Sequence, residues 1–155
     1  MSIKTRLSVG ALTLSLAGTA FIMQEEGTVF KAYLDPVGVP TICTGSTKRV
    51  FLGHTATLRE CEERLQEDTS DAGKAIARYV QVRLTQGQYD ALLSFVFNVG
   101  QGNFSRSTLL RHLNAGECHA TADQFKRWVY AKGIKLRGLV KRRAKEAEMF
   151  REGCA

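Results

Sequence analysis

Proline is scarce in this sequence, and internal repeats, low-complexity tracts and long linkers are missing: 2 Pro stand against 14 Gly in 155 residues. Together with 44% hydrophobic and 24% charged residues, these absences exclude a collagen-like, coiled-coil or intrinsically disordered chain. A chain of this length forms one compact domain with a sizeable core, or at most two small lobes that share one.

Motifs for metals and nucleotides are missing as well. No Cys-x-x-Cys pair occurs and the three histidines share no ligand spacing, so we expect no zinc site. Residues 45–48 lack the preceding Gly of a phosphate loop, and Gly100-x-Gly102 is typical of a helix end followed by a turn. Trp128 lies among basic residues, but an anchor for a helix is favoured over a platform for nucleic acid or sugar. No nucleic-acid partner is therefore expected.

Acidic residues are rare near the C-terminus. The net charge of +7 is concentrated in residues 126–151, which hold ten Lys or Arg and two Glu. Such a patch attracts nucleic acid, acidic lipid and anionic wall polymers alike. The basic run 141–145 lies in a helical pattern with the apolar residues Leu136, Leu139, Val140, Ala144, Ala147 and Phe150. We interpret the run as a solvated helix face rather than a dedicated polyanion site.

Charge is absent from residues 7–23, which follow Lys4 and Arg6 and precede an acidic pair. This pattern is typical of an export signal. As a helix the segment spans roughly 26 Å, slightly less than a hydrocarbon core of about 30 Å. Its Ser, Thr and Gly residues weaken its preference for the membrane further. A signal peptide cleaved at 18–20, a permanent anchor and a buried helix of a cytosolic protein all remain possible interpretations.

Local patterns predict a small antiparallel sheet followed by helices. Residues 28–53 are rich in β-branched and aromatic residues, and Asp35-Pro36-Val37-Gly38 interrupts them with a turn. Helical stripes and stop signals predict helices within 57–80 and over 86–99, 106–115, 120–132 and 138–152, with Gly100, Gly116, Gly133 and Gly153 as stops. Helix 86–99 is apolar on nearly every side, so we expect it at the centre of the core. The predicted class is α+β.

Three polar residues are candidates for chemistry. Glu26 lies where the apolar segment meets the sheet, and contact with apolar surface would raise the pKa of its carboxyl and suit it to donate a proton. Asp35 starts the turn, and Thr41 on the returning strand shares a face with Val39 and Cys43. The spacing alone favours structural roles for these residues. Glu26 would cap a helix end, Asp35 would be an Asx-type turn residue, and Thr41 would simply favour a strand.

The order of these residues resembles the active-site segment of phage-type lysozymes, glycoside hydrolase family 24. The matching segments are Glu26-Gly27, Lys31-x-Tyr33-x-Asp35, Gly38, Thr41-Ile42, 90–100, 107–110, Arg127-Trp128 and the Arg-rich last helix. The resemblance covers nearly the whole chain from residue 24. The chain departs from the family pattern at one point. Members commonly have a His shortly after the Thr, whereas residues 43–46 of this chain are Cys-Thr-Gly-Ser and include no His. Asp68, which resembles the acid that pairs with this His, therefore lacks that charged partner.

The resemblance implies a lysozyme-like fold with a small antiparallel β lobe, a larger α-helical lobe and an apolar N-terminal helix. It implies hydrolysis of the β-1,4 bond between N-acetylmuramic acid and N-acetylglucosamine in peptidoglycan, for which neither a metal nor a cofactor is needed. Glu26 would be the general acid, Asp35 would stabilise the sugar cation or act as base, and Thr41 would position the water. Phe97 and Asn98 are candidate substrate-binding residues, with a role in the core as the alternative. The resemblance favours inversion, for which carboxyl groups about 6.5–9.5 Å apart leave room for water.

The apolar segment also resembles that of signal-arrest-release endolysins of lambdoid-type bacteriophages. In this resemblance the catalytic Glu closes the first helix, which argues for retention of the segment. We therefore expect 1–23 to be a signal-arrest-release segment and 24–155 the catalytic domain. The chain would be tethered and inactive in the host inner membrane through residues 7–23, then released as an active monomer in the periplasm.

Export favours disulfides among the four cysteines, none of which lies within 7–23. Of the three pairings we prefer Cys43 with Cys61 and Cys118 with Cys154, although the sequence leaves the connectivity open. Two other functions remain as alternatives. One is a cationic protein that disrupts membranes without catalysis, and the other is a lytic transglycosylase on the same fold.

Overall fold

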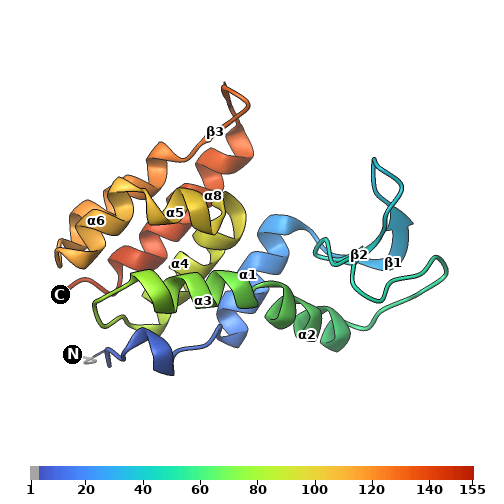
Figure 1. The fold of residues 1–155 in the computed structure, drawn as a ribbon, viewed down its shortest axis with the longest axis horizontal. Coiled ribbons are helices and arrows are strands. Elements are labelled where there is room, and N and C mark those ends of the chain that lie inside the picture. Colours follow the sequence, from blue (N-terminus) through green and yellow to red (C-terminus); the bar gives the residue numbers. More distant parts are fainter. Residues whose placement is uncertain (1–3) are drawn as a thin grey trace. The chain divides into compact units, whose positions relative to one another are not determined.

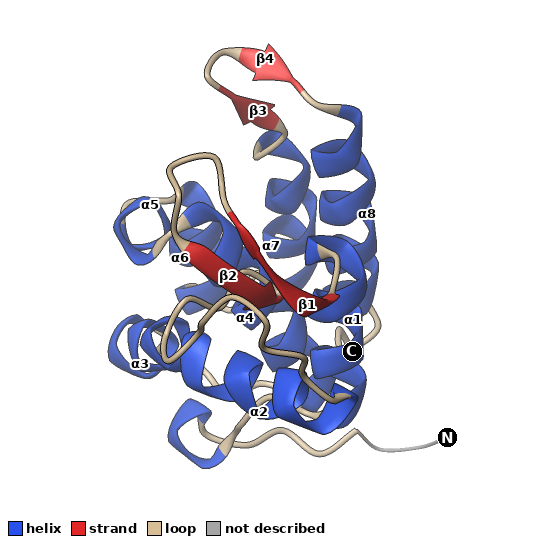
Figure 2. Cartoon of the chain, turned by 90° about the vertical axis from the view of Figure 1, so that its right-hand side faces the viewer, coloured by secondary structure: helices blue, strands red, loops and turns tan. Residues whose placement is uncertain are grey.

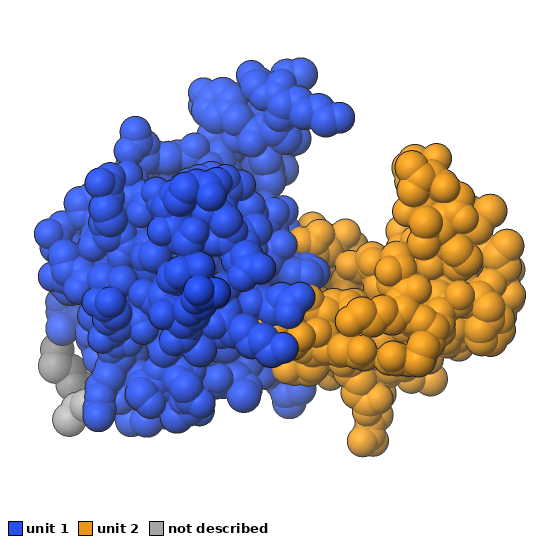
Figure 3. All heavy atoms as spheres, viewed as in Figure 1, with its two compact units in different colours: residues 1–18, 71–155 blue, residues 19–70 orange. Residues whose placement is uncertain are grey.

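The computed structural model describes residues 4–155 and divides them into two compact units. Unit 1 contains the residues up to Gly18 and residues 71–155, and unit 2 contains residues 19–70 (Figure 3). Unit 1 is mainly helical, whereas unit 2 carries the larger of the two antiparallel ribbons, β1 and β2 (Figure 2). The predicted α+β class with a small β lobe and a larger α-helical lobe is therefore confirmed.

The elements of the described residues follow one another along the chain as Figure 1 shows. In order they are η1 (Val9–Ala11), α1 (Leu16–Glu26), β1 (Val29–Leu34), β2 (Pro40–Cys43), α2 (Leu58–Asp68), α3 (Ser70–Tyr79), α4 (Gln86–Val99), α5 (Gln101–Ser105), α6 (Thr108–Asn114), α7 (Cys118–Gln124), η2 (Phe125–Arg127), β3 (Tyr130–Ala131), β4 (Ile134–Lys135) and α8 (Arg137–Arg151).

Unit 2 is built on the antiparallel pair β1–β2. Tyr33 lies opposite Thr41, and the register shifts between Val29 and Tyr33. Thr57 is the N-cap of helix α2, and its hydroxyl accepts a hydrogen bond from the Glu60 N–H. The Cys43–Cys61 disulfide joins the end of β2 to α2, so the second strand and the following helix are covalently linked.

Unit 1 is organised around α4, which is buried over residues 88–96, in line with the prediction of a central core helix. Its N-terminus carries a complete capping box between Thr85 and Gln88. The ring of Phe95 packs edge-on against Phe125 at 5.2 Å and against Trp128 at 5.7 Å between ring centroids. This cluster supports the core-anchor interpretation of Trp128, because aromatic rings favour edge-to-face contacts at such distances.

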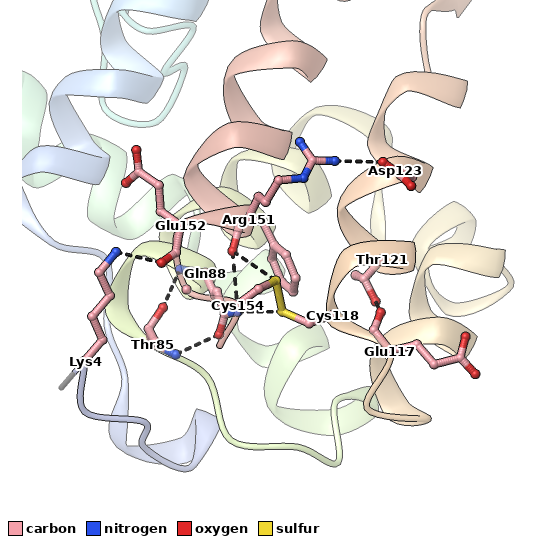
Figure 4. Close-up of a disulfide and its surroundings, with 12 residues drawn as sticks. Lys4, Thr85, Gln88, Glu117, Cys118, Thr121, Asp123, Arg151, Glu152 and Cys154 are labelled. Carbon is pink, nitrogen blue, oxygen red and sulfur yellow. Dashed lines mark hydrogen bonds and ion pairs between the residues drawn. A yellow bond between two sulfur atoms is a disulfide. The ribbon is translucent and has the colours of Figure 1, made fainter. Parts of the chain in front are cut away.

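The C-terminus of unit 1 is fixed by the Cys118–Cys154 disulfide, which joins α7 to the residues after α8 (Figure 4). The N-terminal segment lies against the same region, because Lys4 Nζ donates to the Glu152 carbonyl at 2.7 Å and Arg6 donates to the Gly153 carbonyl at 2.8 Å. Both preferred cysteine pairings are therefore present.

The expected apolar helix over residues 7–23 is not found. Leu7 instead exchanges two backbone hydrogen bonds with Leu84, η1 forms one tight turn, and α1 begins only at Leu16. The late start of α1 has a local cause. Ser15 caps the helix by accepting a hydrogen bond from the Gly18 N–H, so the residues before Ser15 lie outside the helix and form other hydrogen bonds. Among residues 4–155, no helix combines the length and apolarity needed to cross a membrane.

The interpretation of the basic run as a solvated face is wrong for two of its residues. Arg142 and Arg143 are 4% and 0% exposed, whereas Leu136 and Val140, assigned to the apolar stripe, are 42% and 38% exposed. The reason is Glu146, fully buried on the next turn, which pairs with both arginines. Two arginines that share one buried carboxylate can occupy a face that a hydropathy pattern assigns to solvent.

Several helix ends also differ from the prediction. In place of the single helix predicted over 120–132, the structure has α7 followed by the short helix η2. Gly133, with φ +77°, lies in the turn between β3 and β4 and does not end a helix. A separate short helix, α5, follows Gly100 where only a turn was expected. The stripe from 58 to 80 is divided at Thr69, whose hydroxyl donates to the Leu65 carbonyl. Such short-range hydrogen bonds compete with helix propagation.

Candidate functional site

Asp35 and Thr41 are brought together by the backbone of one residue, Val39. The Val39 N–H donates to Asp35 Oδ1 at 2.8 Å, and the Val39 carbonyl accepts from the Asp35 N–H at 3.0 Å and from Thr41 Oγ1 at 2.9 Å. The hairpin between β1 and β2 therefore holds the Asp35 carboxylate and the Thr41 hydroxyl through the N–H and the carbonyl of Val39.

The carboxylate of Asp35 is held through one of its two oxygens. Oδ1 also accepts from the Val37 N–H at 2.9 Å, while the Gly38 N–H closes the turn onto the Asp35 carbonyl. Gly38 has φ +83°, a value that glycine adopts without cost. Within residues 4–155 no hydrogen bond is donated to Oδ2 of this carboxylate, which leaves that oxygen available to a ligand.

Thr41 is 4% exposed and lies opposite Tyr33 in the sheet. Because its single hydroxyl proton is donated to the Val39 carbonyl, its remaining capacity is that of an acceptor. Two residues later, the disulfide at Cys43 ties the strand to α2. The hydroxyl is thus held at a fixed position and is suited to receive a hydrogen bond from a water molecule.

Glu26 is the last residue of α1, in the same unit as Asp35 and Thr41. Gly27, with φ +79°, ends the helix there, and Thr28 donates its hydroxyl hydrogen bond to the Met23 carbonyl at 3.2 Å. These contacts fix the backbone that carries the carboxyl. The side chain of Glu26 is exposed, so the expected burial against apolar surface is not found. Its position at a helix end, rather than within the core, is the reason.

Phe97 and Asn98 lie near the C-terminal end of α4 in unit 1. The nine residues before them, 88–96, are all buried, whereas Phe97 is half-buried and Asn98 is exposed. The pair therefore follows the buried part of the helix toward the surface, and the alternative role in the core does not describe Asn98. Across residues 4–155, no group of three or more His, Cys, Asp or Glu side chains is arranged to hold a metal ion.

Comparison with known proteins places this geometry in a family. The sequence profile of the family described as phage lysozyme matches residues 23–146, which include the three candidate residues of unit 2 and the pair on α4. The chain belongs to the phage lysozyme family. This phage lysozyme is 38% identical to a SAR-endolysin of bacteriophage PS119 over 152 residues, which cover 96% of this chain and 91% of that protein.

Two further relatives support the assignment. A SAR-endolysin of enterobacteria phage P21 is 42% identical over 125 residues, 80% of this phage lysozyme and 76% of that protein. The crystal structure of a P22 lysozyme mutant superposes with a TM-score of 0.85 at 39% identity, covering 90% of this chain and 98% of that chain. The similarity therefore extends from sequence to fold over nearly the full length.

Two features of this lysozyme depend on interaction partners that no motif in the sequence indicates. The first is the Val39 peptide, which no side-chain pattern marks. The second is the buried group of Ser94, Arg142, Arg143 and Glu146. Burial raises the pKa of the Glu146 carboxyl, although Arg143, the Ser94 hydroxyl and Arg142 oppose the increase. An i, i+3, i+4 pattern of opposite charges in the last helix was the available signal.

Proposed function

We propose that this protein is a phage endolysin that hydrolyses the β-1,4 bond between N-acetylmuramic acid and N-acetylglucosamine, with Glu26, Asp35 and Thr41 as its catalytic residues. The observation that carries the proposal is the Val39 clamp, which holds Asp35 and Thr41 on one hairpin in a chain of the phage lysozyme family. Degradation of peptidoglycan in this way leads to lysis of the host cell.

In the proposed mechanism a water molecule lies between Asp35 and Thr41. It donates one proton to the open Oδ2 of Asp35 and the other to Thr41 Oγ1, so its lone pair faces the anomeric carbon. Glu26 donates its proton to the glycosidic oxygen as the bond from that oxygen to the anomeric carbon breaks. The water oxygen forms the new bond to the anomeric carbon and gives a proton to Asp35, which returns it to Glu26 through solvent.

Digestion of purified peptidoglycan is expected to release fragments that end in a reducing N-acetylmuramic acid. A hydrolase adds water across the bond, whereas a transglycosylase closes an internal anhydro ring and yields fragments one water lighter. Mass spectrometry of the released fragments, before and after borohydride reduction, distinguishes the two products. Anhydro ends would contradict the proposed water between Asp35 and Thr41 and favour the transglycosylase alternative.

We also propose that residues 1–23 form a signal-arrest-release segment ahead of the catalytic domain 24–155. Residues 7–23 would first lie in the host inner membrane, where the enzyme is silent, and later enter the periplasm with the active enzyme. The names of the PS119 and P21 relatives support this proposal, as does the uncharged composition of the segment. Peptidoglycan is then the substrate, and the membrane is a transient partner.

The arrangement in the structure corresponds to the released state in this proposal. Asp90, 4% exposed, accepts hydrogen bonds from the Ser15 N–H at 3.1 Å and from Ser15 Oγ at 2.5 Å. Gln86 donates to the Thr13 carbonyl at 2.8 Å. These polar contacts give the Ser15 hydroxyl a partner that lipid lacks, because a hydroxyl without a hydrogen bond in hydrocarbon costs several kcal/mol.

A Thr13→Leu substitution is expected to delay release from the membrane. The Thr13 side chain is exposed and only its carbonyl contacts α4, so the change makes the span more apolar without disturbing the docked segment. Expression followed by an uncoupler and membrane fractionation measures the delay, with Thr13→Ser as the matched control. Purified Thr13→Leu protein should hydrolyse peptidoglycan at the wild-type rate. Equal partition of the two variants into the membrane fraction would contradict the proposal.

A further inference from the structure

The β3–β4 ribbon of unit 1 is exposed on both of its faces. Every residue from 130 to 138 is exposed, and the ribbon projects from the start of α8 (Figure 2). Tyr130 and Ile134 are 61% and 63% exposed, and Leu136 and Val140, where α8 begins, are exposed as well. Several large apolar side chains that lie close together in the sequence are therefore left in contact with solvent.

The turn at the tip of the ribbon carries a charged residue. Lys132 and Gly133 have φ values of +50° and +77°, and Ala131 lies opposite Ile134. These values are typical of a two-residue type I′ turn, in which Asn followed by Gly is a preferred pair. Lysine adopts a positive φ less readily than Asn does, so the turn geometry does not account for a basic side chain at this position.

The two faces of the ribbon differ in chemistry. Residues directly opposite each other in an antiparallel pair share a face, so Ala131 lies with Ile134 and Tyr130 lies with Lys135. Side chains alternate along a strand, which places Leu136 on the side of Ile134. One face is therefore aliphatic, and the other combines a phenol ring with an ammonium group.

Positive charge surrounds these apolar side chains and is not balanced by carboxylates. Residues 124–145 contain nine Lys or Arg and no Asp or Glu. Two of the nine pair with the buried Glu146, but the part of the chain that the structure describes contains no ion pair for Lys132 or Lys135. Unit 1 has 17 Lys or Arg against 7 Asp or Glu, whereas unit 2 has 5 against 8. An anionic surface would therefore attract unit 1 and, within it, the ribbon.

The combination of aliphatic and basic side chains fits an anionic lipid bilayer. Aliphatic groups gain free energy when they leave water for the acyl region, and the stems of Lys and Arg follow them while the charged ends stay among the headgroups. Tyrosine is enriched at the same interface. A glycan presents hydroxyl groups, for which the side chains of Ile134 and Leu136 have neither a donor nor an acceptor.

We propose that the ribbon and the start of α8 form a membrane-docking surface that binds anionic phospholipids. The residues of this surface are Tyr130, Lys132, Ile134, Lys135, Leu136 and Arg137. The contact is distinct from the membrane span proposed for residues 7–23, because it requires a folded unit 1 and enters only the headgroup region. It keeps the released enzyme at the membrane surface, and it does not depend on hydrolytic activity.

Sedimentation of the full-length purified protein with vesicles tests the docking surface. Wild type should bind vesicles of phosphatidylglycerol and phosphatidylethanolamine at low salt, and high salt or vesicles of pure phosphatidylcholine should weaken the binding strongly. The variant Lys132→Asn/Lys135→Gln removes two charges and improves the turn. Its affinity should fall about twentyfold while its melting temperature is unchanged or higher. Ile134→Ser should lower the affinity about tenfold because it removes apolar contact.

Two control variants separate the docking surface from general effects. Lys74→Gln/Arg83→Gln removes the same net charge from exposed positions of unit 1 outside the ribbon, and its affinity should stay within about threefold of wild type. Leu58→Ser removes an exposed leucine from unit 2 and is the control for Ile134→Ser. Equal losses in the two double variants would show that net charge alone attracts the protein, and the inference would be overturned. Residues 7–23 are the same in all variants, so any contribution of that segment to binding cancels.

Purified walls, which contain no lipid, separate the membrane from the polymer. Wild type and Lys132→Asn/Lys135→Gln should bind and hydrolyse walls equally. If the ribbon instead binds peptidoglycan, the variant would lose affinity for walls and keep its affinity for vesicles, a result that also overturns the inference. Inactive wild-type protein would contradict the proposed function, but the vesicle measurement would still decide the docking surface because lipid binding requires no catalysis.

Discussion

Replacement of Glu26 by Gln should reduce the rate of peptidoglycan hydrolysis about a thousandfold while the fold stays intact. The substitution removes only the proton that the glycosidic oxygen must receive, and it preserves the size of the side chain. Glu26 is exposed at the end of α1 and Gln has the same length and shape, so the variant should remain folded. Reducing ends released from purified walls measure the rate, and thermal unfolding measures the fold.

Glu25→Gln is the matched control for this experiment. It makes the same chemical change one residue earlier in the same helix, and it should leave the hydrolysis rate within about twofold of wild type because the proposed mechanism assigns no step to the Glu25 carboxyl. Lysis of whole cells by Glu26→Gln without hydrolysis of purified walls would contradict the enzymatic proposal. It would favour the cationic membrane-disrupting alternative, in which the basic last helix acts without catalysis.

The candidate site was predictable where the signals are local. The turn at 35–38 was read from Pro and Gly at their preferred positions, and the structure shows that Asp35 is an Asx-type turn residue through Oδ1. This structural role does not exclude the proposed catalytic one, since Oδ2 is a separate oxygen. The role in the turn and the proposed catalytic role, which the sequence presented as alternatives, are therefore compatible in the carboxylate of Asp35.

The features that the sequence did not reveal depend on partners far along the chain. Nothing near Leu7 shows that its backbone pairs with Leu84, and nothing near Arg143 shows that it binds Asn98 on another helix. Hydropathy describes each residue alone, so it assigned Leu7 to a continuous helix and Arg143 to a solvated helix face. Disulfide pairing was an intermediate case, because four cysteines allow only three connectivities and the expected export favours disulfides over free thiols.

A chain that begins at Phe21, fused to a cleavable export signal, should be strongly destabilised and should lose lytic activity. The truncation removes both Ser15 donors to the buried carboxylate of Asp90 and the buried side chains of Leu12 and Leu14. An under-satisfied buried group costs about 1–3 kcal/mol, and each lost leucine about 1.5–3 kcal/mol. The total is a large part of the about 5–15 kcal/mol that stabilises a small domain. Only six residues of α1 would remain to carry Glu26.

A point variant of the full chain separates the docking of the segment from its mere presence. A Cβ atom at Gly18 would lie 2.6 Å from Asp90 Cγ and 2.7 Å from a Leu14 methyl, so Gly18→Ala must displace the contact between α1 and Asp90. Gly10→Ala is the matched control, since a Cβ there meets nothing within 4 Å. Melting temperature and wall hydrolysis should fall in Gly18→Ala and in the truncated chain, but not in Gly10→Ala. Full lytic activity from residues 21–155 would show that the catalytic domain folds without the docked segment, and the link between release and activation would then fail.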